Sequence, residues 1–342
     1  MISNLSHCKP RSIFQLELGQ RNRIYSQTAI NSITSITENN ERAVSRSDIL
    51  DDAEQYRDVE IIFLSGWSAA KMDAELLSAL PNLKVYFYGA GSVRKLVTEA
   101  FWKREIKLSS AYKVNATPVV EYSVSSIVMG LKQAWHFNAM LKAGRDQVDY
   151  SRIRGVYYGS RVGIISLGAI GQNVARILTS QHDVDVFAYD PFAEEATFSD
   201  LCVTRVDSLD ALFSHCEVVS LHAPWLQETE GLISGDMLRS MPPYGTFINT
   251  SRGAIVREEE MLEVLQERSD LCAVLDLIQD QGAFDLTPLA RLPNVFITPH
   301  IAGSMGNECQ LMGDFAVAGC KRYLQGILLE CQLTQKSAEH LA

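Results

Sequence analysis

Short runs of apolar, β-branched and aromatic residues alternate along this chain with stretches in which apolar residues recur every three or four positions. In the first part of the chain the strand-like runs are 12–18, 59–64 and 83–88, and the segment 72–80 has helical spacing. Strands that alternate with helices are typical of a parallel sheet whose strands are joined by crossover helices. The pattern therefore predicts an α/β fold.

Two long helices are expected further along the chain. Residues 118–142 have Pro118 at a first-turn position, Glu121 close behind it and apolar residues at intervals of three and four, which predicts one helix. We expect this helix to carry the chain from one domain into the next. Residues 147–160 are polar and glycine-containing, which predicts a loop, and residues 304–329 have the spacing of the second helix. The last dozen residues are polar and are expected to be loosely held.

Residues 161–190 combine the features of a dinucleotide-binding unit. A β run at 161–165 leads into a glycine-rich turn with Gly168 and Gly171, and a helical pattern and a second β run follow before Asp190. The first glycine lets the backbone approach a pyrophosphate, and the start of a helix offers free N–H groups and the positive end of its dipole. The second glycine permits close packing of the helix on the strand. The arrangement predicts a dinucleotide site.

Asp190 indicates which dinucleotide is expected. It lies 22 positions after Gly168, where a carboxylate can bind both hydroxyls of a ribose and would repel a 2′-phosphate, so NAD is favoured over NADP. Ser166 stands at the first glycine position of the usual motif, which weakens the motif taken alone. The alternative is a glycine-rich turn that only packs tightly, and the surrounding strand, helix and strand together with Asp190 favour cofactor binding.

Four further β runs end in polar or reactive side chains. The runs are 218–221, 246–249, 272–275 and 295–298. The side chains at their ends are His222, Asn249, Arg252, Asp276 and His300. Because the carboxyl ends of strands line the ligand crevice in open parallel sheets, we expect all of these except His222 to converge on the reactive end of the cofactor. His222 is expected to shape the cofactor loop.

Composition and charge narrow the function classes. A chain of 342 residues is expected to form about two domains, and 46% hydrophobic with 21% charged residues exclude disorder as the main state. A net charge of −10 without a basic cluster argues against nucleic acid as a partner. Seven cysteines without metal-ligand spacing fit reduced thiols rather than a disulfide framework or a metal site. No apolar stretch approaches the ~20 residues of a membrane span, so we expect a cytoplasmic protein without a membrane partner.

The motifs also occur in the order typical of one enzyme family. They are Val162-Gly163-Ile164-Ile165-Ser166-Leu167-Gly168-Ala169-Ile170-Gly171, Tyr189-Asp190-Pro191, Leu221-His222-Ala223-Pro224, Phe247-Ile248-Asn249-Thr250-Ser251-Arg252-Gly253, Ala273-Val274-Leu275-Asp276, Leu292-Pro293-Asn294-Val295 and Thr298-Pro299-His300-Ile301-Ala302-Gly303. From about Pro81 to Gly303 the chain resembles the D-isomer-specific 2-hydroxyacid dehydrogenases. The resemblance implies a Rossmann-type doubly wound NAD-binding domain, residues 117–301, inserted into a flavodoxin-like substrate domain, residues 1–116 plus 302–342. It also implies a homodimer formed through the cofactor domain.

The resemblance implies an active site of an arginine, a histidine and an acid. Arg252 matches the arginine, whose planar fork can hold a substrate carboxylate and polarise the 2-keto oxygen. His300 matches the acid/base residue, whose pKa suits proton transfer to and from that oxygen. An ion-pair role for Arg252 and a purely structural role for His300 are the alternatives. The expected reaction interconverts a small 2-keto acid and its D-2-hydroxy acid.

Gln281 departs from the family, which has glutamate at this position. A carboxylate would raise the pKa of the imidazole, whereas an amide only orients the ring through a hydrogen bond. Formate dehydrogenase-type chemistry, which needs no proton transfer, is therefore one alternative. Asp280 supplying the carboxylate through a local backbone shift is another. The third is an NAD(H)-binding regulatory protein with weakened catalysis. Ala169 also replaces a common arginine, which removes a cation from the pyrophosphate.

The remaining site residues follow from the resemblance by position. The expected cofactor-binding residues are Ser166, Gly168, Ala169, Ile170, Gly171, Asp190, Pro191, His222, Ala223, Pro224, Thr229, Asn249, Thr250, Ser251, Asp276 and Gly303. The expected substrate-binding residues are Trp67, Ala90, Gly91, Ser92 and Arg252. The backbone N–H groups near Gly91 would form an anion site, and Trp67 is either a pocket wall or an ordinary half-buried aromatic.

Overall fold

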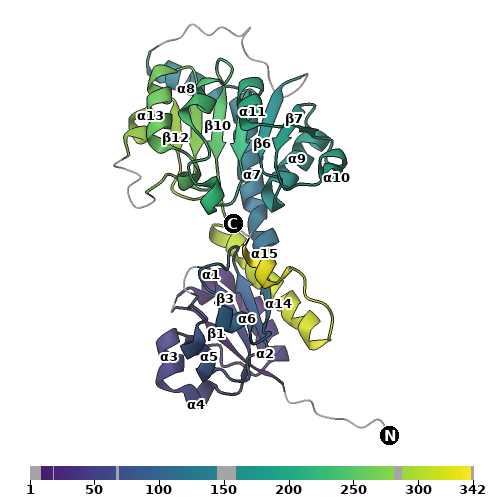
Figure 1. The fold of residues 1–342 in the computed structure, drawn as a ribbon. Coiled ribbons are helices and arrows are strands. Elements are labelled where there is room, and N and C mark those ends of the chain that lie inside the picture. Colours follow the sequence, from purple (N-terminus) through teal and green to yellow (C-terminus); the bar gives the residue numbers. More distant parts are fainter. Residues whose placement is uncertain (1–8, 18, 67–68, 145–158, 281–286, 340–342) are drawn as a thin grey trace. The chain divides into compact units, whose positions relative to one another are not determined.

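The computed structural model describes residues 9–17, 19–66, 69–144, 159–280 and 287–339. The chain divides into two compact units (Figure 1). Unit 1 consists of Met1–Ala116 and Ser304–Ala342, and unit 2 consists of Thr117–Gly303. The chain therefore leaves unit 1, forms the whole of unit 2 and returns to unit 1.

Unit 1 is built on a six-stranded sheet in the order β13-β5-β4-β3-β1-β2. Its strands are β1 (Arg11–Gln15), β2 (Ala43–Val44), β3 (Val59–Ser65), β4 (Val85–Gly89), β5 (Lys107–Ser110) and β13 (Gln332–Leu333). The first five run parallel in the flavodoxin-like order 2-1-3-4-5, and β13 pairs antiparallel with β5. A parallel sheet needs cover on both faces, because its strands are apolar on both sides.

Helices cover both faces of the unit 1 sheet. On one face lie α1 (Arg21–Ile24), α2 (Gln27–Ile36) and α14 (Cys309–Leu324), which pack on Phe14, Phe63 and Phe87. On the other face lie α3 (Arg46–Asp51), α4 (Ala53–Tyr56), α5 (Ala74–Ala79), α6 (Glu99–Trp102) and α15 (Gln335–Glu339). The C-terminal helix α14 thus completes a layer that the N-terminal part of the chain begins.

Unit 2 is built on a seven-stranded parallel sheet in the order β12-β11-β10-β9-β6-β7-β8. The strands are β6 (Arg161–Ile165), β7 (Asp185–Tyr189), β8 (Thr204–Arg205), β9 (Val218–Leu221), β10 (Thr246–Asn249), β11 (Cys272–Leu275) and β12 (Val295–Ile297). This is the Rossmann order, which reverses between β6 and β9. In sheets of this order the ligand crevice forms at that switch point, beyond the carboxyl ends of both strands.

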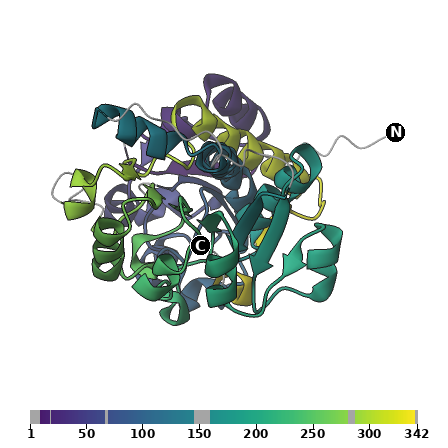
Figure 2. The same ribbon diagram turned by 90° about the horizontal axis from the view of Figure 1, so that it is seen from above.

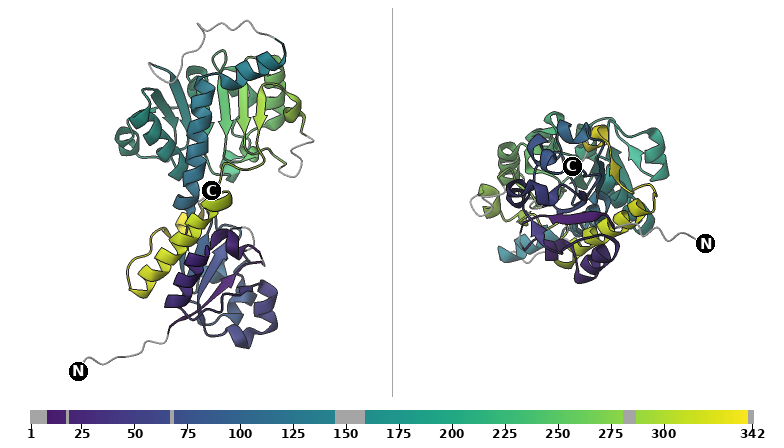
Figure 3. Two further views of the ribbon diagram at one scale, coloured as in Figure 1. Left: turned by 180° about the vertical axis from the view of Figure 1, so that it is seen from behind. Right: turned by 90° about the horizontal axis from the view of Figure 1, so that it is seen from below.

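The unit 2 sheet also has two packed faces. On one face α11 (Leu209–His215), α12 (Gly235–Arg239) and α13 (Glu258–Glu267) pack on Ile165, Phe247 and Leu275. On the other face α7 (Tyr112–Leu131), α9 (Ala169–Gln181) and α10 (Glu195–Asp200) pack on their neighbours Ile164, Ile248 and Val274. Figure 2 shows these layers from above, and the left view of Figure 3 shows α7 crossing the second face. Successive side chains of a strand point to opposite faces of the sheet. Because both faces are covered by helices, the central strands are apolar throughout.

Two predicted helices differ from those observed. The helix expected over 118–142 is two helices, because α7 ends at Leu131, Gln133 adopts a left-handed conformation with φ 52°, and α8 (Ala134–Lys142) follows. Pro118 lies inside α7 and not in its first turn. The helix expected over 304–329 is shorter, since α14 ends at Leu324 after a 3₁₀ turn at Gly306–Glu308. Most of the loop expected at 147–160 lies outside the described residues.

Among the described residues no helix is both long and apolar enough to cross a membrane.

Candidate active site

The glycine-rich turn after β6 is shaped for close approach of a ligand. Ser166 adopts a left-handed conformation with φ 75°, a geometry that favours glycine. A Cβ on Gly171 would lie 2.0 Å from the Ser166 carbonyl oxygen, so glycine is required there for α9 to pack on the turn. A Cβ on Gly168 would meet nothing within 4 Å. Gly168 precedes the first residue of α9, so open space adjoins the N–H groups that begin this helix.

Asp190 ties this turn to the end of β7. Its Oδ2 accepts the Leu167 N–H at 2.7 Å, and its Oδ1 accepts the N–H groups of Phe192 and Ala193 at 2.8 and 3.1 Å. The Ser166 hydroxyl lies 3.4 Å from Oδ2. The side chain is 8% exposed. Each carboxylate oxygen has two lone-pair sites, and these four donors fill them. The Ser166 contact is the longest of the four, so a ribose hydroxyl that binds Oδ2 would take the place of the Ser166 hydroxyl.

His222 is a buried, neutral histidine beside the same turn. Its backbone N–H donates to the Ile165 carbonyl at 2.9 Å, and its ring Nε2 lies 3.0 Å from the Ser220 hydroxyl. Burial lowers the pKa of His222 to about 4. Within the described residues Nδ1 has no hydrogen-bond partner although it is buried. A buried ring nitrogen without a protein partner is available to a water or to a bound molecule.

The loop after His222 is held by two hydroxyls. Thr229 donates to the Pro224 carbonyl at 2.6 Å and accepts the Leu226 N–H at 2.8 Å. Ser251, in the next loop, donates to the Ala223 carbonyl. Both expected cofactor-loop residues, Thr229 and Ser251, therefore have structural partners in this protein.

Asn249 organises the turn that carries Arg252. Its Nδ2 donates to the Arg252 carbonyl at 3.0 Å, and its Oδ1 accepts the Ser251 N–H at 2.9 Å. A Cβ on Gly253 would lie 2.1 Å from the Ile278 carbonyl carbon, so this turn rests directly on the loop after β11. The Arg252 guanidinium is partly buried and donates to the Ser251 carbonyl at 2.6 Å. Burial lowers the pKa of Arg252, although it stays charged at neutral pH.

Asp276, at the end of β11, holds the turn that carries His300. The carboxylate is fully buried. It accepts the Ile301 and Ala302 N–H groups at 2.8 and 2.9 Å, and its backbone carbonyl accepts the His300 N–H at 3.0 Å. His300 has φ 56°, in the left-handed region. These bonds hold a non-glycine residue in a conformation that costs free energy.

Arg252 and His300 act on each other electrostatically. Partial burial lowers the pKa of His300, the positive charge of Arg252 lowers it further, and the negative charge of Asp276 opposes both. The imidazole is therefore a weaker base than an ordinary histidine. A cationic fork beside a titratable imidazole can bind an anionic substrate and exchange a proton with it.

The predicted residues fall into three groups. The residues of the Ser166 turn, Asp190, His222, Asn249, Arg252, Asp276 and His300 all lie at the carboxyl edge of the unit 2 sheet, where the strand order places them. Ala90, Gly91 and Ser92 follow β4 in unit 1, and the Ser110 hydroxyl donates to the Ala90 and Gly91 carbonyls at 2.8 Å. Trp67 and Gln281 lie outside the described residues.

Two hydroxyl residues beside the site, Tyr122 and Ser123, are not among the residues that the sequence predicts there. Tyr122 and Ser123 are neighbours on α7, and they contact Thr298 and Thr250 respectively. Thr298 also donates to Asp276. The sequence shows that hydroxyl residues interrupt the apolar face of α7. It does not show which residues these hydroxyls contact.

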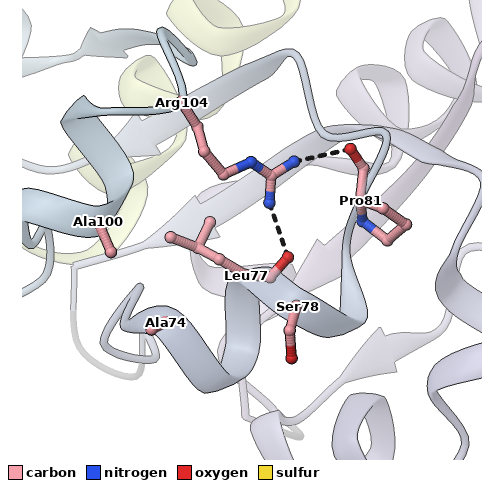
Figure 4. A pocket seen from close by; sticks show the side chains of 6 residues that line it. All are labelled: Ala74, Leu77, Ser78, Pro81, Ala100 and Arg104. Carbon is pink, nitrogen blue, oxygen red and sulfur yellow. Dashed lines mark hydrogen bonds between the residues drawn. The ribbon is translucent and has the colours of Figure 1, made fainter.

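A separate hollow occurs in unit 1 between α5 and α6. Arg104 lines it and donates to the Leu77 and Pro81 carbonyls at 2.7 and 2.8 Å (Figure 4). It also donates to the Leu80 carbonyl at 2.9 Å. The guanidinium therefore closes the end of α5. Among the described residues no group of three or more His, Cys, Asp or Glu side chains could hold a metal ion.

Comparison with known proteins identifies the family. Residues 124–302, more than half of the chain, match the D-isomer-specific 2-hydroxyacid dehydrogenase NAD-binding domain. The chain belongs to this family. The Bacillus subtilis protein YoaD, which carries the name of a 2-hydroxyacid dehydrogenase, is 30% identical over 263 residues, or 73% of this chain and 75% of YoaD. D-3-phosphoglycerate dehydrogenase of Methanocaldococcus jannaschii is 27% identical over 81% of this chain and 52% of that protein, so the chain spans about half of its length.

A solved structure confirms the fold of the family. D-mandelate dehydrogenase of Rhodotorula graminis, solved in its apo form, aligns with a TM-score of 0.77 at 21% identity. The alignment covers 96% of this chain and 98% of that enzyme. The fold prediction, a Rossmann-type unit inserted into a flavodoxin-like unit, is confirmed.

The residues of unit 2 fit the NAD that this family binds. Open space adjoins Gly168 at the start of α9, where a pyrophosphate binds in this fold, and a ribose hydroxyl could replace the long Ser166 contact on Asp190. The orphan Nδ1 of His222 is the observation that most directly calls for a ligand. The match to the NAD-binding domain of the family confirms the NAD prediction.

Proposed function

We propose that this protein is an NAD-dependent oxidoreductase that interconverts a small 2-keto acid and its D-2-hydroxy acid. The observation that carries the proposal is that the loops after β10 and β12 place Arg252 and His300 at the carboxyl edge of the unit 2 sheet, where the positive charge of Arg252 lowers the pKa of His300. NAD, when bound, accepts or supplies the hydride. The protein must supply a carboxylate anchor, a polarising charge and a proton.

Arg252 supplies the anchor and the polarising charge. Its partly buried guanidinium keeps its charge in a site of reduced dielectric, where attraction to an anion is stronger than in water. The planar fork can bind the substrate carboxylate with one N–H pair while another N–H approaches the keto oxygen. Asn249 fixes the backbone on which Arg252 stands.

His300 exchanges the proton. Reduction of the keto acid needs the protonated imidazole as donor, and oxidation of the hydroxy acid needs the neutral imidazole as acceptor. Because the pKa of His300 is lowered, its imidazole loses the proton at a pH below the range in which an ordinary histidine titrates. We expect the rate of keto-acid reduction to fall as the pH rises through a midpoint below ~6.5. The rate of hydroxy-acid oxidation should rise over the same pH interval.

A substrate screen tests the proposal. Full-length protein with NADH is assayed for loss of NADH absorbance on glyoxylate, pyruvate, phenylglyoxylate and 3-phosphohydroxypyruvate, which range from a small to a bulky or charged side chain. At least one is expected to turn over. Arg252→Lys, which keeps the charge but loses the fork, should raise KM by ~10-fold or more, and His300→Asn should lower kcat by ~10²-fold or more. Tight NADH binding without turnover of any keto acid would contradict the proposal.

A second candidate follows from Gln281 and the lowered pKa of His300. Without the family glutamate, nothing at position 281 raises that pKa, which suits a formate-type hydride transfer or a regulatory NAD(H)-binding protein. NAD with formate is therefore included in the screen. In an active keto-acid reductase, Gln281→Glu should move the pH midpoint of reduction upward. In a regulatory protein this variant leaves the keto acids without measurable turnover.

A further inference from the structure

We propose that Tyr122 is a positioning residue for His300, acting through the Thr298 hydroxyl and the Asp276 carboxylate. The inference rests on the proposed function, in which His300 transfers the proton. It assigns a role to a side chain of α7 that does not itself touch the reacting atoms.

A continuous hydrogen-bond chain joins α7 to the His300 turn. The Tyr122 hydroxyl lies 2.8 Å from the Thr298 hydroxyl, which donates to Asp276 Oδ1 at 2.6 Å. A threonine hydroxyl has one proton, and that proton is committed to the carboxylate. Tyr122 must therefore be the donor in its bond with Thr298. Both protons point toward the charge, an arrangement in which each bond polarises and strengthens the next.

The carboxylate at the end of this chain holds the backbone on the far side of His300. It accepts the Ile301 and Ala302 N–H groups at 2.8 and 2.9 Å, and the His300 N–H also donates to the Thr298 carbonyl at 3.0 Å. Thr298 thus contacts the turn through both its side chain and its backbone. Because His300 is held at φ 56°, weaker bonds would let the turn relax toward a commoner conformation.

Tyr122 has surroundings that make its hydroxyl effective. Half-burial is the main cause that raises the pKa of Tyr122, with Asp276 adding to it and the bond to Thr298 opposing it, so the phenol stays protonated and remains a donor. The ring is carried by α7, whose apolar side chains Val120, Val124 and Ile127 are buried against the sheet. The donor therefore sits on a rigid element, and this rigidity is what a positioning residue needs.

Ser123 provides a matched control on the same helix. Its hydroxyl is buried and lies 3.1 Å from the Thr250 hydroxyl, so Ser123→Ala also removes one hydrogen bond between α7 and a loop of the sheet edge. That bond does not lead to Asp276. If Tyr122→Phe and Ser123→Ala lower the free energy of unfolding equally but only Tyr122→Phe changes the pKa of His300, Tyr122 positions His300 and does more than anchor the helix.

The first measurement is the pKa of His300 in the full-length protein without substrate, followed by NMR of the imidazole and assigned with His300→Asn. The charged groups that face His300 among the described residues are Arg252, which lowers the pKa, and Asp276, which raises it. Burial is the largest cause, so a relaxed turn should return the pKa toward its ordinary value. We expect an increase of ~0.5 or more in Thr298→Val and a smaller increase in Tyr122→Phe. Thr298→Ser, which keeps the hydroxyl, and Ser123→Ala should match the wild type.

The second measurement is the split between kcat and KM for a keto acid that the screen finds to be a substrate. Tyr122→Phe should lower kcat by ~5-fold or more and leave the NADH dissociation constant within ~2-fold, because the proton donor is displaced while the cofactor site is intact. If Tyr122→Phe and Thr298→Val leave both the His300 pKa and kcat like those of Ser123→Ala, the inference is wrong. If the wild type turns over no keto acid, the proposed function fails, and the His300 pKa still decides the positioning role.

Discussion

His222 shows at the scale of one residue how a binding crevice lowers stability. Its Nδ1 is buried without a partner within the described residues, and its imidazole stays neutral well below the ordinary histidine range. Both features cost free energy in the protein without its cofactor. A dinucleotide that supplies the missing partner would stabilise the folded state by mass action.

The buried imidazole predicts a specific loss of stability in acid. Burial lowers the pKa of folded His222 from 6.5 to about 4, so between these values the unfolded chain takes up a proton that the folded chain does not. The free energy of unfolding should therefore fall as the pH drops from 6.5 to 4, by up to about 3 kcal/mol from this residue alone. Urea unfolding of the cofactor-free protein across this pH range measures the slope.

Two variants show whether His222 causes the dependence of stability on pH. His222→Gln keeps an amide for Ser220 but does not titrate, so its stability should depend less on pH than that of the wild type. His215 is exposed at the end of α11, and His215→Gln should retain the wild-type slope. Identical slopes in wild type and His222→Gln would show that another group causes the acid sensitivity.

At the scale of the elements, the strands of unit 2 were predictable for a physical reason. The bounds of β6, β9, β10 and β11 agree with the expected runs to the residue. These strands occupy the middle of a parallel sheet, so they are apolar on both faces and stand out from the polar loops around them. The edge strand β12 is less buried, and it ends one residue before the prediction.

Helix α7 was less predictable because tertiary packing decides its ends. Pro118 removes one N–H donor, yet the helix continues through it with buried side chains on both sides. The residue that takes the left-handed conformation at the break, Gln133, is neither a glycine nor a proline, so its position does not stand out in the sequence. A Cβ on Gly130 would lie 3.2 Å from Thr246 Cβ, so the helix end is pressed against β10. Contacts of this kind join residues far apart in the sequence.

The candidate active site was also predictable only in part. The motifs locate the loops that carry Arg252 and His300, because strand order alone brings the carboxyl ends of parallel strands together. The hydrogen bonds within the site could not be predicted. Tyr122 is separated from Thr298 by 176 positions, and no local pattern relates the two. The substrate pocket was also beyond prediction, since Trp67 follows no motif of the family.

Two glycines of one turn give opposite predictions. A Cβ on Gly171 would lie 2.0 Å from the Ser166 carbonyl oxygen, so Gly171→Ala should lower the free energy of unfolding by ~2 kcal/mol or more. Gly168 has φ −71° and free space, so Gly168→Ala should leave stability within ~0.5 kcal/mol. Its new methyl group would occupy the space where a pyrophosphate must approach, and NADH affinity should fall by ~10-fold or more.

Urea unfolding and NADH fluorescence titration test the glycine pair together. The informative result is a stable Gly168→Ala protein with weakened NADH binding. Wild-type NADH affinity in that variant would mean that the cofactor does not contact this turn. A stable Gly171→Ala protein would mean that α9 can move away from Ser166 at little cost.

At the scale of the whole molecule, net charge sets a condition on binding. The chain carries a net charge of −10, and both NAD and a 2-keto acid are anions. Long-range attraction is therefore weak, and the positive potential has to be local. Arg252, whose guanidinium is partly buried, and the start of α9 supply this local positive potential in unit 2.

Exposed apolar side chains on unit 2 favour a homodimer. Met129 on α7, Leu141 on α8 and Phe296 on the edge strand β12 are 41%, 56% and 39% exposed. Phe296 stacks on Trp135 of α8 at 4.4 Å, so α8 and β12 share this surface. A stable interface buries ~800 Å² on each partner around an apolar centre. A second copy of the chain, related by a two-fold axis, would cover such a surface with itself.

Light scattering coupled to size-exclusion chromatography tests the dimer. The wild type should elute with twice the mass of the chain at micromolar concentration, and Leu141→Glu should shift it to the monomer because two like charges would be buried against each other. Leu328→Glu is the control, since Leu328 is 84% exposed in unit 1 and the charge change is the same. A monomeric wild type would refute the dimer, and a monomer produced by both variants would show that added charge rather than the α8 surface controls assembly.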